Sequence, residues 1–131
     1  MKQPNYEYAF EEFKNSIIKE VERHSNIIRA DKISPALYEK INRFYHGKAK
    51  DKEYISAIRV ISDCLYAYHN KKVIILIDEY DVPLESAYFR GYYDEMVNLI
   101  RSVFESALKT NEALEFGVLT GCLRISKESI F

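Results

Sequence analysis

The sequence predicts an α/β domain in which a parallel βαβ sheet follows three helices. Apolar residues in the first seventy positions recur at steps of three and four, as on one face of a helix. The run VIILI at 73–77 is continuous and β-branched, which is typical of a parallel strand covered on both faces. With 131 residues, 47% of them hydrophobic, we expect a single domain over 1–131, helical at about 1–70 and βαβ at about 71–131.

Three helices are expected before the strand. The first runs from residue 5 to the high twenties, and the second begins at Ser34-Pro35, an N-cap residue followed by proline at the first helical position, and ends near Gly47. Asp51 is expected to cap the third helix, which ends just before Asn70. The core stripe of the first helix is Tyr6, Phe10, Phe13, Ile17 and Val21, and that of the third is Tyr54, Ile58, Ile61, Leu65 and Tyr68.

A strand, a helix and a second strand complete the chain. After the strand at 73–77 we expect an irregular stretch from Val82 to Gly91. A wide apolar stripe around Met96, Ile100 and Val103 then predicts a helix that ends near residue 109. The second apolar strand covers about 114–119. A strand, a helix and a strand in this order form a βαβ unit with a right-handed crossover, so the two strands should be parallel.

Composition excludes several classes of protein. Nineteen Lys and Arg against 20 Asp and Glu give a net charge of -1, so a broad surface for nucleic acid or anionic membrane is not supported. No apolar run is long enough to span a bilayer, and residues 1–10 lack the apolar stretch of a signal peptide, so we expect a cytoplasmic protein. Cys64 and Cys122 are expected to be free thiols, Cys64 as a buried small hydrophobic residue.

Chemistry is expected where the strands end, because open parallel sheets bind ligands at the carboxyl ends of their strands. The first strand leads into Asp78, Glu79 and Asp81, and the second leads into Thr120 and then Arg124. The carboxylate and hydroxyl oxygens of these residues are ligands that Mg²⁺ prefers, and the guanidinium of Arg124 is suited to bind a phosphate. The pattern therefore favours a magnesium-phosphate site.

Apolar residues followed by Asp-Glu also form the Walker B pattern of P-loop ATPases, and a second strand about forty residues later, ending in a polar residue, is typical of sensor 1. The segments KKVIILIDEYDVPL, FRGYYDEMVNLIRSVF and FGVLTGCLRISKESIF closely resemble the AAA-ATPase-like family. This resemblance implies a P-loop NTPase-like sheet, Asp78 as the ligand of Mg²⁺, Glu79 as the catalytic base and Thr120 as the sensor 1 residue. It places Arg124 with nucleotide sensing and Asp81 as a supporting acid.

The sequence departs from this family because the phosphate-binding Walker A motif, GxxxxGK[ST], is absent from the 131 residues. We therefore expect a fragment that runs from Walker B to sensor 1 and is not an active ATPase alone. Mg²⁺ and ATP would be cofactors of the intact parent, with none bound to this chain by itself. The resemblance implies two further parts of the parent, an N-terminal Walker A segment and a C-terminal PD-(D/E)XK nuclease-like domain.

Alternative interpretations remain open. The chain could be a non-catalytic interaction module that retains the ATPase fold, or a metal-dependent nuclease that uses Asp78, Glu79 and Asp81. Asp78-Glu79 could also be a solvated strand end. In this ATPase class the Walker A strand lies between the other two, so here the two strands either pair directly or receive partners from another copy. We expect self-association, with the strand at 73–77 at or near the contact.

Overall fold

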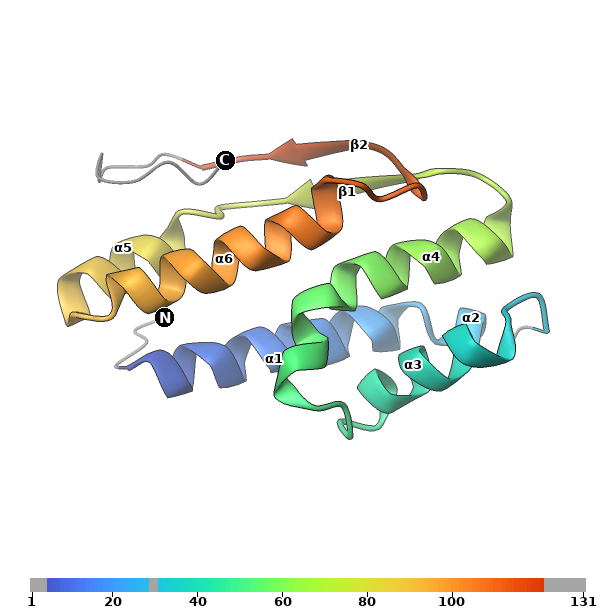
Figure 1. Ribbon diagram of the computed structural model, residues 1–131, viewed down its shortest axis with the longest axis horizontal. Coiled ribbons are helices and arrows are strands. Elements are labelled where there is room, and N and C mark those ends of the chain that lie inside the picture. Colours follow the sequence, from blue (N-terminus) through green and yellow to red (C-terminus); the bar gives the residue numbers. More distant parts are fainter. Residues whose placement is uncertain (1–4, 29–30, 122–131) are drawn as a thin grey trace.

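The computed structural model describes residues 5–28 and 31–121, and it confirms an α/β fold (Figure 1). Its elements are α1 (Tyr6–Arg23), α2 (Ser25–Ile28), α3 (Pro35–Tyr45), the 3-10 helix η1 (Asp51–Ser56), α4 (Ala57–His69), β1 (Val73–Ile77), α5 (Val82–Arg90), α6 (Tyr93–Leu108) and β2 (Leu114–Leu119). None of the helices in these two ranges is long and apolar enough to cross a membrane.

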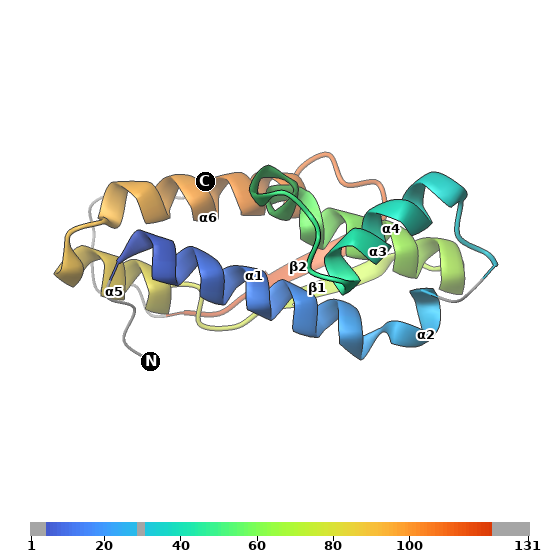
Figure 2. The ribbon, with the colours of Figure 1, turned by 90° about the horizontal axis from the view of Figure 1, so that it is seen from below.

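The helices lie on one side of the sheet. Figure 1 shows the two strands along one side of the molecule, α4 and α6 next to them, and α1 and α3 farther away. Helix α4 contacts β1, and α6 contacts β2. The view in Figure 2 shows α6 and α1 running side by side in projection, with α5 beside them at the same end of the molecule. The helices therefore cover the inner face of the sheet.

The strands β1 and β2 are parallel, as the sequence predicts, and they pair directly with each other. The register aligns Ile74 with Phe116 and Ile77 with Leu119, with one irregularity between Val73 and Ile74. Helices α5 and α6 form the crossover that a parallel connection requires. Of the two expected arrangements, the chain adopts the one in which its own strands pair.

Two groups of buried side chains form the core. One joins the first half of α1 with α5 and α6, and the ends of β1 and β2 pack against it; the other joins the second half of α1 with α2, α3, η1 and α4. Phe13 and Ile58 pack against both groups, so α1 and α4 connect them. Phe44 and Tyr54, both fully buried, meet edge to face with their ring centroids 5.1 Å apart.

Several predicted helix ends are confirmed, and the first helix is shorter than predicted. Ser34 caps α3, accepting a hydrogen bond from the Leu37 N–H at 3.3 Å, and Asn70 ends α4 in the left-handed conformation. The first helix does not continue to the high twenties. It ends at Arg23 because the N–H of His24 donates to the Val21 carbonyl three residues back, and α2 begins as a separate short turn.

The prediction that Asp51 caps the third helix is wrong. Residues 51–56 form η1, and α4 begins only at Ala57. The Asp51 carboxylate instead pairs with Lys14 on α1 at 3.0 Å. The Lys14 ammonium also lies 5.2 Å from the Phe10 ring centroid. The Asp51 side chain, which the local pattern assigned to a helix cap, therefore forms a tertiary ion pair instead.

The stretch from Val82 to Gly91, predicted to be irregular, is the helix α5. Pro83 lies in its first turn, where the missing N–H of proline costs nothing, and Gly91 ends it with φ of 87°. Leu84 and Ala87, three residues apart, are fully buried against α6. Proline and glycine, read as turn signals, here mark the two ends of a helix.

The strand β1 is also less covered than predicted. Ile75 is 8% exposed, but Ile74 is 50% exposed and Leu76 is 73% exposed. Within residues 5–28 and 31–121 the helices lie on the inner face alone, so only that face is dry. The continuous apolar run predicted that helices pack on both faces of β1. In the described part of the chain no helix packs on the outer face.

Cys64 is buried on α4, as expected. Burial raises the pKa of its thiol to about 12, so the thiol stays protonated and unreactive near neutral pH. Cys122 lies outside the described residues.

If α5 is a core helix, the Leu84→Ala substitution should lower the free energy of unfolding by about 3 kcal/mol, because it leaves a cavity in a fully buried position. Phe89, which is 75% exposed on the same helix, is the matched control. We expect Phe89→Ala to change stability by less than about 0.5 kcal/mol. Urea denaturation measures both, and equal effects would contradict this assignment of the buried face.

Candidate functional site

The carboxyl ends of β1 and β2 are joined beyond the last strand residues. The N–H of Thr120 donates to the Ile77 carbonyl at 2.9 Å, and the N–H of Tyr80 donates to the Thr120 carbonyl at 3.0 Å. These bonds continue the ladder of the parallel sheet by one more step. Because the two strand ends are held together in this way, the polar residues that follow them lie at one edge.

The hydroxyl of Thr120 connects two of the expected site residues. It donates a hydrogen bond to the Asp78 carboxylate, and it accepts one from the backbone N–H of Glu79 at 3.1 Å. One hydroxyl thus orients a carboxylate and fixes the backbone beside it. Asp78, Glu79 and Thr120, predicted from separate parts of the sequence, are brought together here.

Glu79 has a backbone conformation that is unusual for a residue with a side chain. Its φ is 53°, in the left-handed region that favours glycine. A non-glycine residue in this region costs on the order of 1 kcal/mol, and such residues often lie at functional sites. The bond from the Glu79 N–H to Thr120 helps to hold this conformation, which turns the chain from β1 toward α5.

Asp81 lies at the start of α5, where it is 6% exposed. Its carboxylate lies against the backbone of Gly121, because a Cβ atom built on Gly121 would lie 2.7 Å from the Asp81 Oδ1 and 2.9 Å from the Tyr80 ring. Only glycine lets the chain pass this close. The side chain of Asp81 is therefore packed under the residue after Thr120, while Asp78 and Glu79 are exposed.

An open cavity of about 460 Å³ lies at this edge. It is rich in carboxylates and, in the part of the chain that the structure describes, is lined by no lysine or arginine; its lining residues are Asp78, Glu79, Asp81, Val82, Glu85, Thr120 and Gly121. A second cavity of about 420 Å³ lies on the helix side, where Asp78 and Glu79 also form part of the wall and most of the lining is apolar. The two carboxylates thus stand between a polar and an apolar space.

Glu85 is the residue of this cavity that the sequence interpretation missed. Its position follows from α5, which brings the first turn of the helix back over the strand end. Pro83 and Gly91, taken as the two ends of a helix, would have given the signal.

The carboxylates do not form a compact ligand cluster. Over the described ranges, no three His, Cys, Asp or Glu side chains are arranged so that they could hold a metal ion together. The nuclease alternative depends on such a group made by Asp78, Glu79 and Asp81, and this arrangement gives it no support. Arg124, expected to sense nucleotide, lies outside the described residues.

If the Thr120 hydroxyl organises this edge, Thr120→Val should lower the free energy of unfolding by about 0.5–1.5 kcal/mol, because it removes the hydrogen bonds to the Asp78 carboxylate and from the Glu79 N–H. The conservative change Thr120→Ser should stay close to wild type. Amide hydrogen exchange at Glu79 gives a local measure. Exchange there should become faster in the valine variant alone, and unchanged exchange would show that the bond does not hold this backbone.

Comparison with known proteins gives one match. A sequence model of the AAA-ATPase-like family, described as "Predicted AAA-ATPase", matches residues 2–131. A search of curated proteins and a search of solved structures both gave no match.

Proposed function

The chain belongs to the AAA-ATPase-like family, and on this premise we propose that Asp78, Glu79 and Thr120 form the metal-binding half of a Mg-nucleotide site. The observation that carries the proposal is that these residues meet at the carboxyl edge of a parallel sheet. That edge is where open α/β sheets bind ligands. The other half, a Walker A loop, would come from a segment outside these 131 residues, as in a fragment of a longer ATPase.

Each residue has a distinct role in this proposal. Asp78, whose carboxylate is oriented by the Thr120 hydroxyl, would hold Mg²⁺ largely through water. Glu79, which is exposed and follows Asp78 in the chain, would serve as the general base once a nucleotide and its attacking water were in place. Asp81 supports the edge from below through its packing against Gly121. Arg124 senses the nucleotide as the family resemblance implies.

The residues present fit a hard divalent cation. The described residues that line the cavity at this edge offer side-chain oxygen ligands, from carboxylates and a hydroxyl, and Mg²⁺ prefers such ligands. Mg²⁺ commonly binds through one or two carboxylates and keeps several waters, so a compact group of three acids is not needed. When bound, the ion would neutralise phosphate charge and orient the phosphate oxygens.

The same residues do not fit the phosphates of ATP. Within residues 5–28 and 31–121, four carboxylates line the cavity, Asp78, Glu79, Asp81 and Glu85, and no lysine or arginine does. A row of backbone N–H groups of the P-loop type is missing from the sequence as well. Phosphate contacts would therefore have to come from a Walker A loop supplied by another segment, and we derive no step on ATP for this chain alone.

The alternative function is a non-catalytic interaction module that retains the ATPase fold. The missing Walker A motif and the exposed outer face of the sheet favour it for this chain taken alone. Metal binding at Asp78 distinguishes the two functions, because an interaction module has no need of a cation at this edge.

The metal site is tested with Mn²⁺ as a paramagnetic substitute for Mg²⁺. In the wild-type chain, millimolar Mn²⁺ should broaden the amide NMR signals of residues 78–80 and 120–121 first, since they surround the ion. Asp78→Asn should abolish this selective broadening. Glu79→Gln should retain it, because the base is not a ligand. Asp31→Asn, at an exposed aspartate outside the cavity, is the control, and selective broadening that survives in Asp78→Asn would refute the proposal.

A second prediction concerns nucleotide. The isolated chain should give no saturable heat when titrated calorimetrically with Mg-ATP at about millimolar concentration, because the P-loop supplies most phosphate contacts in this class of ATPase. A micromolar dissociation constant would contradict this, and would require a phosphate site that the Walker pattern does not describe.

A further inference from the structure

The outer face of the sheet is an exposed apolar surface. Its four large side chains are 40–73% exposed and form two pairs in the strand register, Ile74 with Phe116 and Leu76 with Val118. The largest apolar patch of a monomer often has an interaction role. We call these four residues the outer face.

We propose that the outer face is the contact surface between two copies of this chain, packed face to face with their β1 strands antiparallel. This proposal does not depend on nucleotide or metal binding. It goes beyond self-association as such, because it assigns the face, the direction of the strands and the residues that meet.

Charge along β1 makes the face complementary to itself. Residues of one parity share one side of a strand, and the residues at 72, 74, 76 and 78 are Lys, Ile, Leu and Asp. The strand thus has a basic end, an apolar middle and an acidic end. A two-fold axis across the strands places Lys72 of one copy over Asp78 of the partner subunit, whereas a parallel arrangement would set like charges together.

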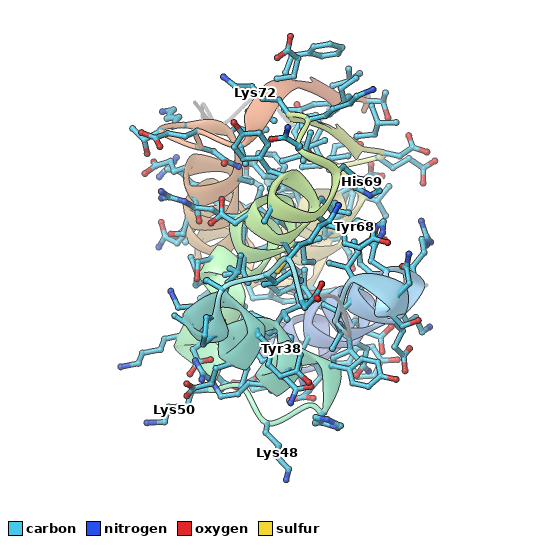
Figure 3. All side chains as sticks on the ribbon, turned by 90° about the vertical axis from the view of Figure 1, so that its right-hand side faces the viewer. Tyr38, Lys48, Lys50, Tyr68, His69 and Lys72 are labelled. Carbon is cyan, nitrogen blue, oxygen red and sulfur yellow. The ribbon has the colours of Figure 1, made fainter. Side chains whose placement is uncertain are left out.

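The charged ends are open to such a partner. Lys71, Lys72, Asp78 and Glu79 are all exposed. Lys72 is at one end of the molecule, with Tyr38 on α3 well away from it (Figure 3). Glu115 also lies at this end, at the irregularity of the register, and its carboxylate offsets one lysine charge. The end stays positive because it carries two lysines, Lys71 and Lys72.

Size and net charge fit a weak dimer of identical chains. At the exposed fractions of these four side chains, the outer face leaves on the order of 400 Å² open, the size of the largest apolar patch of a typical monomer. A stable interface needs about 800 Å² from each partner, so the outer face with its charged ends gives a reversible dimer. The net charge of -1 adds little repulsion between copies.

The experiment is sedimentation velocity on the full chain from about 10 µM to about 1 mM, the range of weak association. The weight-average mass should rise with concentration from 15.4 kDa toward twice that value. Leu76→Lys should raise the dissociation constant at least about tenfold, since it puts two charges into the apolar centre. Tyr38→Lys is the matched control because Tyr38 is 41% exposed on α3, and it should behave as wild type.

A charge swap tests the direction of the strands. Lys72→Asp alone should weaken the dimer by several-fold, and adding Asp78→Lys should restore it, because the pair is then reversed but intact. Circular dichroism checks that each variant folds, and Val118→Lys replaces Leu76→Lys if the latter does not. A wild-type chain that stays at 15.4 kDa throughout would overturn the proposal, as would equal association of the wild type and the outer-face variants. A swap without rescue would overturn the antiparallel arrangement.

Discussion

The direct parallel pairing of β1 with β2 is the constraint on which the rest of this structure depends. A parallel pair needs a long connection, and α5 with α6 supplies it, while α4 and α6 cover the inner face. The pairing also sets both carboxyl ends at one edge, where the ladder continues through Thr120. A strand inserted between the two would separate them by about 9.5 Å, too far for the Thr120 hydroxyl to reach Asp78 directly. The bond is therefore specific to strands that are neighbours.

The direct pairing of β1 with β2 bears on the proposed nucleotide site. In the ATPase class that the sequence resembles, the Walker A strand lies between the strands that correspond to β1 and β2. An arrangement that binds ATP would then keep Asp78 and Thr120 at the same edge but apart, with phosphate and Mg²⁺ between them. In the chain alone a hydrogen bond joins these two side chains, and the same hydroxyl helps to hold the left-handed backbone of Glu79. Opening the sheet would release both constraints together.

Sequence patterns predicted the parts of the fold that depend on local periodicity and strong end signals. Ser34 and Asn70 end their helices as expected, and the apolar runs at 73–77 and 114–119 are the strands. The failures arise where tertiary contacts decide. Asp51 leaves its expected cap for Lys14, and the apolar run of β1 cannot reveal which of its faces this part of the chain covers. Asp78 and Thr120 could be placed at one edge from topology, but their hydrogen bond depends on the neighbouring strands, which no local pattern specifies.

Asp78 belongs to both proposals, and this links them. A carboxylate that coordinates a divalent cation is less available to a lysine of a partner subunit, because the ion cancels the negative charge that attracts the ammonium group. By thermodynamic linkage, a dimer that engages Asp78 must then bind the cation more weakly, and the cation must weaken the dimer by the same factor. The outer face and the carboxylate edge are adjacent along β1, so under the two proposals a single strand would carry both contacts. A further segment that bound to the outer face would prevent the dimer contact. Asp78 would then be available to the metal ion without competition from a lysine of a partner subunit.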